Sequence, residues 1–222
     1  MSKDKKMKIW LRMTQSMRRA AEERPKKAAV LLAIAALLVM VLMAVLAVFL
    51  DGRMGDNAAL LIASLVIGPV FFVIHHERAR RITVRNTLLM ALAGTVIGAV
   101  VVMWAGRPPR MEACGDFFMF NCHAMWINTI IIIPLLEEKV VRGVLLDACR
   151  TLFGNLPAIM ATTLMFAAAH WRIFAWTLVF SALLAWLAIY RKMGVIERAM
   201  AHGSYNLVLT VAALPFTDLW KY

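Results

Sequence analysis

Cysteine is scarce in this chain, and the cysteines present form no recognised motif. Cys114, Cys122 and Cys149 are the three among 222 residues, and no C-x-x-C pair occurs. This excludes zinc ribbons and thioredoxin-type redox sites. The H-E-x-x-H pattern is also missing, which excludes a zincin metalloprotease. Cys114 and Cys122 share one polar loop, where a disulfide and two free thiols are equally compatible with the sequence. Cys149 is expected to be intracellular and reduced.

Acidic residues are also few. Thirteen Asp and Glu stand against 25 Lys and Arg, which gives a net charge of +12. The basic segments lack the aromatic pattern or recognition fold of a nucleic-acid-binding protein, so no nucleic-acid partner is expected. Ten Lys and Arg precede residue 28, and four more lie within 78–85. Cytoplasmic loops of membrane proteins carry such an excess, and it attracts anionic membrane lipid.

Polar residues are a minority of the whole chain. The chain is 62% hydrophobic, with a mean hydropathy of +0.74, whereas soluble domains are about 45–50% apolar. The fold class expected is all-α, a multi-pass membrane helical bundle of about seven transmembrane helices. The apolar segments that predict these helices are roughly 28–50, 58–74, 87–105, 125–146, 156–171, 173–190 and 195–214.

The basic residues also predict domain organisation and orientation. Residues 1–27 form a basic cytoplasmic segment, either a surface helix or a disordered tail, and residues 28–222 form the transmembrane domain. The first apolar run is too long for a cleavable signal peptide. With the N-terminus in the cytoplasm, inner loops hold 20 Lys and Arg and outer loops hold 5. This predicts a multi-pass protein of the inner (cell) membrane. Glu197 and Arg198, which begin the last segment, are expected to reach the interface.

Six polar residues interrupt the apolar segments of the C-terminal half. An ionisable group at bilayer depth costs at least ~2.5–3.5 kcal/mol and tends to mark function. Glu138 and Arg142 are four residues apart on one helix and can pair. Glu137 then points elsewhere without an obvious local cation, as a candidate general base or acid. The six residues are Glu137, Glu138, Arg142, His170, His202 and Asn206.

Each group has a purely structural explanation too. The acidic pair with its arginine could be an interfacial charge cluster, His170 beside Trp171 could be an interfacial residue, and His202 with Asn206 could be a polar contact between helices. Together, however, they match the needs of peptide hydrolysis, which are a base for water, donors for the oxyanion and an acid for the leaving amine. Glu137 with His170 can supply the first and third, and His202 with Asn206 the second.

These residues lie in three short motifs. Residues 137–142 read EExxxR, residues 166–170 read FxxxH, and residues 202–206 read HxxxN. In this order on successive membrane helices, the motifs resemble those of the CPBP family. That family holds the eukaryotic type II CAAX prenyl endopeptidase and bacterial proteins tied to bacteriocin processing and self-immunity. The resemblance covers residues 125–214, which we expect to be the catalytic core.

The resemblance implies an intramembrane endopeptidase that hydrolyses a peptide bond of a membrane-associated protein or peptide. Glu137 and His170 would activate water, and His202 and Asn206 would stabilise the oxyanion. Glu138 and Arg142 would support the site, and Phe166 would pack. The family is often described as metalloproteases, and Glu137, His170 and His202 are chemically able to hold Zn²⁺. A glutamate base without metal is the alternative, and we favour it slightly over a tightly bound structural metal.

Two other function classes fit less well. A catalytically idle relative could bind and retain a membrane partner, as a self-immunity protein would. A proton-coupled carrier could use Glu and His as a relay, but it would need repeated architecture, which the sequence lacks. The sequence predicts no oligomeric state. At 1.5 Å per residue, His170 lies higher in the membrane than Glu137 and His202. Helix tilt, or a helix that begins in the cytoplasm, must bring them to one level, around a hydrated cavity that opens toward the cytoplasm.

Overall fold

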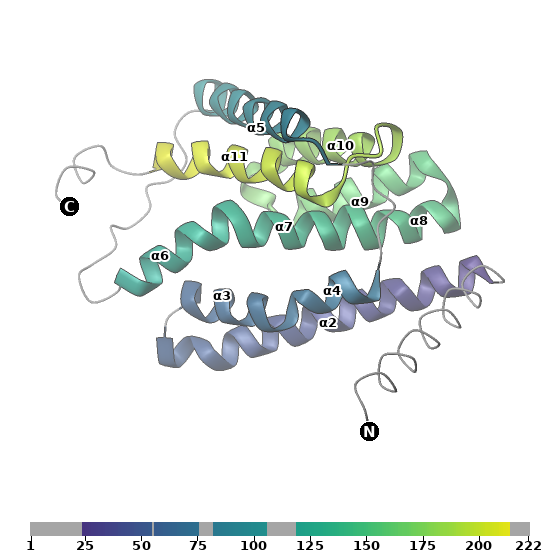
Figure 1. The fold of residues 1–222 in the computed structure, drawn as a ribbon, viewed down its shortest axis with the longest axis horizontal. Coiled ribbons are helices and arrows are strands. Elements are labelled where there is room, and N and C mark those ends of the chain that lie inside the picture. The colour runs from purple at the N-terminus through teal and green to yellow at the C-terminus, as the bar shows by residue number, and fades with distance from the viewer. Residues whose placement is uncertain (1–23, 55, 76–81, 106–118, 214–222) are drawn as a thin grey trace.

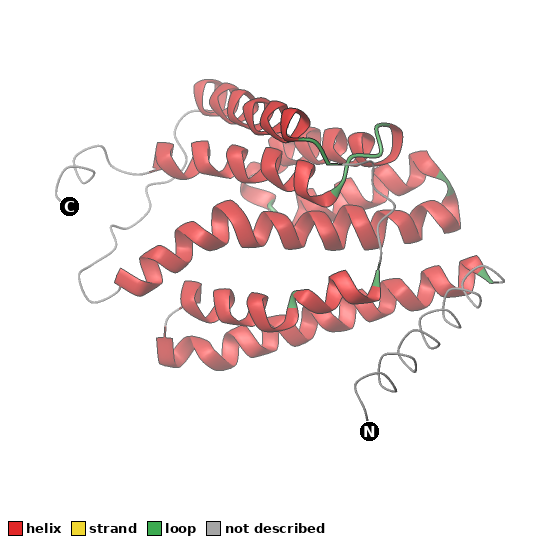
Figure 2. Ribbon diagram, in the orientation of Figure 1, coloured by secondary structure: helices red, strands yellow, loops and turns green. Residues whose placement is uncertain are grey.

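The computed structural model describes residues 24–54, 56–75, 82–105 and 119–213 (Figure 1). All regular secondary structure within these ranges is helical (Figure 2). Residues 1–23, Cys114 and the side chain of Cys122 lie outside the described part. The surface helix expected at the N-terminus and the disulfide therefore stay predictions.

Each predicted apolar segment is helical. The first three segments correspond to α2 (Pro25–Met54), to α3 (Asp56–Ile67) with α4 (Pro69–Ile74), and to α5 (Val84–Ala105). The last three correspond to α9 (Asn155–Ala169), α10 (Phe174–Tyr190) and α11 (Val195–Ala213). The fourth is a continuous helical run of five parts: α6 (Met119–Ile127), η2 (Asn128–Ile132), α7 (Ile133–Glu137), η3 (Glu138–Leu145) and α8 (Leu146–Phe153).

Three helical stretches among the described residues are long and apolar enough to cross a membrane. They are Pro25–Asp51, Asp56–Val73 and Val84–Trp104. Asn155–Ala169 and Phe174–Tyr190 are shorter apolar helices. The chain is thus an all-α membrane helical bundle, as predicted.

Successive helices run back and forth along the bundle (Figure 1). Helix α2 packs against α3 and α8, and α5 packs against α11. The run from α6 to α8 passes between these two groups, and α9 and α10 lie behind it (Figure 1). Helix α11 contacts η2, α7 and η3 along the central run. The segments that carry the three motifs therefore meet inside the bundle. The first motif spans α7 and η3, the second lies on α9 and the third lies on α11.

Proline shapes the middle of the central run. Pro134 has no N–H, so carbonyls one turn earlier lose their helical donor, and the backbone adopts π-helical geometry in η2. Helix α11 covers two of these carbonyls. Asn206 Nδ2 donates to the oxygen of Thr129 at 3.0 Å. Gly203 lies against the oxygen of Ile130, where a Cβ would overlap it. π-Bulges of this kind are frequent at functional sites.

Glycine also brings α5 against α11. Gly94 and Gly98 form a G-x-x-x-G pair, which lets two membrane helices approach closely. A Cβ on Gly94 would overlap the carbonyl oxygen of Ala201, whereas a Cβ on Gly98 would lie 3.0 Å from Cβ of Val208. A Cβ on Gly98 would also lie 3.1 Å from the oxygen of Tyr205, but this needs a far smaller shift than the overlap at Gly94, so the two glycines are not equivalent.

Gly94→Ala is therefore expected to destabilise the protein more than Gly98→Ala. Overpacking typically costs about 1–3 kcal/mol, and the backbone clash places Gly94→Ala at the upper end of that range. Thermal unfolding of the purified variants in one detergent measures the difference. Equal unfolding temperatures would contradict the close approach of α5 and α11.

Candidate active site

A buried carboxylate is at the centre of the polar cluster. Glu138 begins η3 and is 0% exposed. Its Oε1 accepts a hydrogen bond from Arg142 Nη1 at 2.9 Å, and its Oε2 accepts one from Arg198 Nε at 3.3 Å. His202 Nδ1 lies 3.2 Å from Oε1. The predicted pairing of Glu138 with Arg142 is confirmed, and two further donors share the carboxylate.

Arg142 connects the carboxylate to α9 and α10. Its Nη2 donates to Ser181 Oγ at 2.7 Å. The guanidinium carbon lies 4.1 Å from the ring centroid of Phe166, in cation–π geometry. Phe166, predicted only to pack, thus covers a buried charge. Arg142, Ser181 and Phe166 are all buried, so the arginine depends on protein partners.

Arg198 does not reach the interface as predicted. It is 0% exposed and bonds Glu138, and it also donates from Nη1 to the oxygen of Met193. Glu197 is buried as well, with Oε2 accepting from the N–H of Gly194 at 3.1 Å. The prediction failed because the first turn of α11 packs against η3. The arginine has an internal anion there and need not extend toward water.

The sequence did contain a signal for Arg198. Arg198, His202 and Asn206 follow one another at intervals of four residues, which places them on one face of a helix. His202 was already identified on that face as a site candidate.

His202 lies between the two adjacent glutamates. Its Nδ1 faces Glu138, and its Nε2 lies 3.6 Å from Glu137 Oε2. An ionised carboxylate can only accept, so the contact with Glu138 assigns the ring hydrogen to Nδ1. The rings of Phe166 and Phe180 meet the imidazole edge-on, each with centroids 5.8 Å away. Glu137, for which the sequence suggested no local cation, therefore has His202 as its partner.

The two glutamates differ in access to water. The side chain of Glu137 is 28% exposed, whereas that of Glu138 is 0% exposed. Glu137 ends α7, just where the backbone changes to the π-helical η3. Of the two, Glu137 alone can meet a water molecule and act on it.

His170 lies at the end of α9, beyond Phe166. Its Nδ1 is 2.9 Å from the oxygen of Phe166, and the two rings are 4.6 Å apart between centroids. Because a carbonyl only accepts, Nδ1 carries the hydrogen and Nε2 is the acceptor. Within the described part of the chain, no hydrogen bond or ion pair joins His170 to Glu137.

The α8–α9 hairpin nevertheless brings Glu137 and His170 to one level. Glu137 lies 16 residues before Phe153, where α8 ends, and His170 lies 17 residues after it. In two antiparallel helices, positions equally far from the turn lie at similar height. The mismatch in depth that segment boundaries predicted disappears because α8 extends the hairpin beyond residue 146.

Asn206 lies one turn beyond His202 and is partly buried. Its amide holds Thr129 of η2 and does not bond the two glutamates. An amide nitrogen carries two hydrogens, so this contact uses one of them. The structure therefore brings Glu137, Glu138, Arg142 and His202 together directly. It connects His170 through Phe166, and it places Asn206 at the edge of the cluster.

A metal would need ligands that converge more closely. Among the described residues, no group of three His, Cys, Asp or Glu side chains is placed to hold a metal ion. Glu137 and His202 offer two neighbouring donors, but His170 is linked to His202 only through the ring of Phe166, which contacts both imidazoles. The described arrangement of these three side chains does not present a preformed zinc site.

A second polar cluster ties α4 to the central run. Lys139 Nζ donates to the oxygen of His75 at 2.7 Å, where α4 ends. His75 Nε2 lies 3.4 Å from Asp147 Oδ2. Asp147 Oδ1 also lies 4.0 Å from Arg150 Nη1. Lys139 thus satisfies a helix-end carbonyl, which gives its burial a structural explanation.

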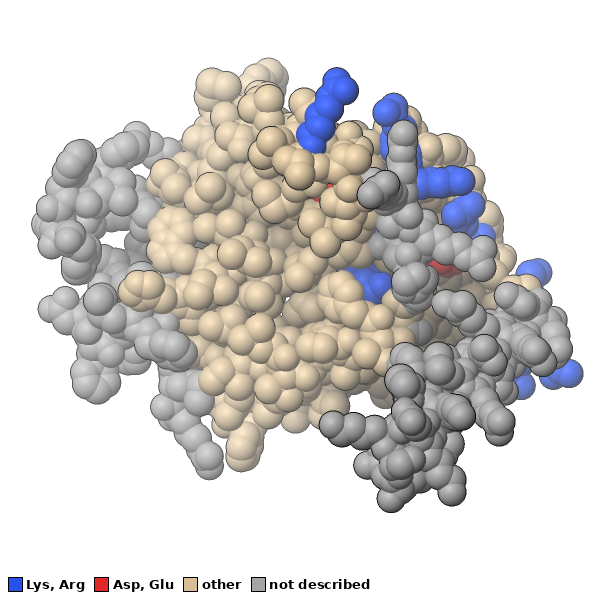
Figure 3. All heavy atoms as spheres, viewed as in Figure 1, with Lys and Arg blue, Asp and Glu red and all other residues tan. Residues whose placement is uncertain are grey.

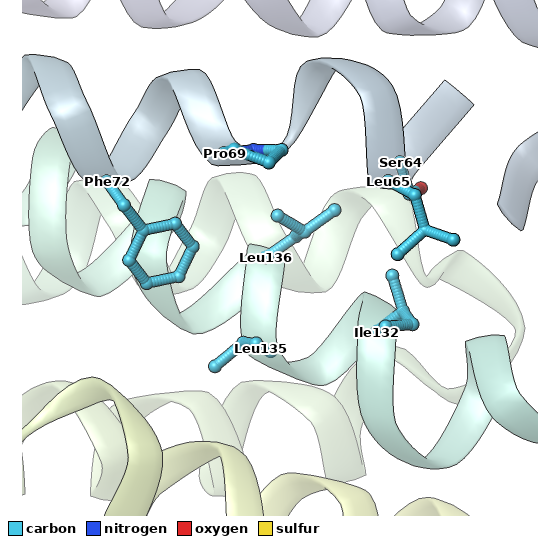
Figure 4. A pocket seen from close by; sticks show the side chains of 7 residues that line it. All are labelled: Ser64, Leu65, Pro69, Phe72, Ile132, Leu135 and Leu136. Atoms are coloured by element: carbon cyan, nitrogen blue, oxygen red, sulfur yellow. The ribbon is translucent and has the colours of Figure 1, made fainter. Parts of the chain in front are cut away.

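An apolar cavity of about 220 Å³ lies between α3, α4 and the central run (Figure 4). None of the six predicted site residues lines it, so it is distinct from the hydrated pocket expected around them. Leu135 and Leu136, which precede Glu137, form one wall. The remaining lining residues are Ser64, Leu65, Pro69, Phe72 and Ile132.

Neutralising Glu138 is expected to destabilise the protein far more than neutralising Glu137. Glu138→Gln leaves two buried arginines without their anion, which should lower the free energy of unfolding by about 3–5 kcal/mol. Glu137→Gln changes a partly exposed contact, with an effect of about 1 kcal/mol or less. Thermal unfolding in detergent compares the two. Similar losses would contradict the central place of Glu138.

The comparisons with known proteins agree with the motifs. Residues 120–208 match the family model described as type II CAAX prenyl endopeptidase Rce1-like. The searches of curated proteins and of solved structures returned no match. The matched segment contains all six polar residues of the cluster and the FxxxH phenylalanine. Residues 120–208 are therefore similar to the Rce1-like type II CAAX prenyl endopeptidases, in agreement with the resemblance predicted from the three motifs.

Proposed function

We propose that this protein is a glutamate-dependent intramembrane endopeptidase, with Glu137 as the base that activates water. The proposal rests on the difference in solvent exposure between the two neighbouring carboxylates. Glu138 is sealed among three donors, whereas Glu137 is 28% exposed and faces His202 Nε2. A buried, paired carboxylate supports a site, and an accessible one beside an imidazole can exchange protons.

The first step is attack of water on the peptide carbonyl. Glu137 takes a proton from the water, and the water oxygen bonds to the carbonyl carbon. His170 lies at the height of Glu137 across the α8–α9 hairpin and has Nε2 as an acceptor. It orients the same water from the opposite side. Collapse of the tetrahedral intermediate breaks the carbon–nitrogen bond, and the leaving amine takes the proton from Glu137.

His202 and Asn206 stabilise the negative oxygen of the intermediate. Glu138 keeps a hydrogen on Nδ1 of His202, so a second proton can only be held on Nε2, beside Glu137. In that doubly protonated form His202 donates to the oxyanion. The second N–H of Asn206 lies one turn along the same helix face. Preorganised donors of this kind contribute about 2.7–4 kcal/mol each in other hydrolases.

The substrate is a protein or peptide associated with the membrane. The matched family is described as prenyl endopeptidases, so a prenylated CAAX peptide is the first probe. We also propose that the N-terminus is cytoplasmic and that the helices cross the cell membrane several times. Lys and Arg side chains gather toward the end of the bundle where α2 begins (Figure 3). This supports a cytoplasmic face at that end.

Glu137→Gln is expected to lower cleavage by about 10²–10⁴-fold, because the general base is lost. Purified protein in proteoliposomes would be tested on an internally quenched farnesylated CAAX peptide, on the same peptide without farnesyl and on an apolar membrane peptide. Asp147→Asn, which alters an exposed carboxylate on α8, is the matched control and should cleave normally.

Two outcomes of this assay would overturn the proposal. Full activity of Glu137→Gln would remove Glu137 as the base. Failure of the wild type on all three peptides, together with a cellular effect that survives Glu137→Ala, would favour a binding protein of the same fold. A chelator arm tests metal dependence, and the glutamate mechanism predicts unchanged cleavage in chelator.

The orientation has its own test in intact cells. In a variant without native cysteines, Asp56→Cys should react with a membrane-impermeant thiol reagent from outside. Lys192→Cys should react after permeabilisation only. Both native side chains are exposed, one at the start of α3 and the other in the turn after α10. The reverse pattern of labelling would place the N-terminus outside.

A further inference from the structure

We infer that Arg198 is a positioning residue of this site: it fixes Glu138, and Glu138 in turn keeps the hydrogen of His202 on Nδ1, so that Nε2 faces Glu137. The consequence for catalysis rests on the proposed function. The tautomer of His202 does not, because it follows from contacts within the folded protein.

The geometry gives each oxygen of Glu138 its own arginine. Arg142, on the same helical run, holds Oε1 at 2.9 Å. Arg198, from α11, holds Oε2 at 3.3 Å. His202 shares Oε1 at 3.2 Å. Arg198 is therefore the contact that occupies the oxygen left open by Arg142 and prevents the carboxylate from turning away from the imidazole.

The protonation of Glu138 decides the tautomer of its neighbour. An ionised carboxylate can only accept, which requires a hydrogen on His202 Nδ1, whereas a neutral carboxylic acid can donate to that nitrogen. Glu138 has no exposed surface, so nearby cations and not water must support its charge. With Arg198 removed, Oε2 loses the donor that fixes it, and the carboxylate can turn away from His202 Nδ1, which no longer has an acceptor for its hydrogen.

If Arg198 only stabilised the fold, its guanidinium would not need to be fixed at two points close to His202. Arg198 is completely buried and is tied at a second point, because its Nη1 donates to the oxygen of Met193 in the turn before α11. That anchor fixes the guanidinium relative to the start of α11, four residues before His202. One face of α11 thus carries both the imidazole of His202 and Arg198, the residue that determines which ring nitrogen is protonated.

The neighbouring Glu197 provides a matched control. It is buried like Arg198, belongs to the same turn and bonds the N–H of Gly194, not Glu138. Glu197→Gln keeps an oxygen for that N–H. It tests whether any change of a buried charge at the start of α11 disturbs His202.

The first measurement is ¹⁵N NMR of histidine-labelled protein in lipid nanodiscs, with His202→Gln used to assign the signal. The wild type, Glu197→Gln and Arg198→Lys should show a protonated Nδ1. Arg198→Met should lose that signature and show hydrogen on Nε2. If Arg198→Met does not fold, Arg198→Leu tests the same link with a shorter apolar side chain. A protonated Nδ1 retained in folded Arg198→Met or Arg198→Leu would overturn the inference.

The second measurement is kinetic and uses the farnesylated CAAX peptide. Arg198→Met should lower kcat by about tenfold or more with KM little changed, because the doubly protonated His202 that donates to the oxyanion loses the carboxylate that accepts its Nδ1 hydrogen. Arg198→Lys should restore most of the loss. Adding Arg198→Met to Glu138→Gln should have little further effect, because residues that act through one contact are not additive. Additive losses would overturn the inference. A wild type that cleaves no peptide would count against the proposed function alone, since the NMR result decides the role of Arg198.

Discussion

One buried carboxylate constrains the arrangement of this bundle. Glu138 has no contact with solvent, and its charge is stabilised because η3 and α11 each bring an arginine to it. Arg142 extends the connection to Ser181 on α10 and to Phe166 on α9. Taking such ions out of water is costly unless geometry and hydrogen bonding are good. The helices that carry the three motifs are therefore held together by charge as well as by apolar packing.

The adjacent glutamates illustrate how one short motif can provide two functions. Successive helical residues point in different directions, and the change from α7 to η3 falls between Glu137 and Glu138. Glu138 turns inward toward the arginines, and Glu137 remains partly exposed. His202 contacts both, through different nitrogens, so the supporting carboxylate and the reactive one act on the same ring. The proposed chemistry depends on this separation.

Much of the fold followed from sequence because apolar run length is a direct requirement of the membrane. The seven segments and the pairing of Glu138 with Arg142 needed only local spacing. Arg198 was missed because local spacing does not show whether the first turn of a helix faces lipid headgroups or a neighbouring helix. The height of His170 depended on how far α8 extends past the apolar run. The bond from Asn206 to Thr129 depended on a carbonyl that Pro134 left without a helical donor. Each of these features depends on how the helices are arranged in three dimensions.

Phe166 affects the electrostatics of the site although its side chain carries no charge. It covers the guanidinium of Arg142, meets His202 edge-on and contacts His170. Coulombic attraction weakens as the local dielectric constant rises. By filling the space around the guanidinium, the ring keeps water from the arginine–glutamate pair and so sets the strength of an interaction in which it carries no charge. The aromatic residue of the FxxxH motif thus acts as an insulator for its charged neighbours.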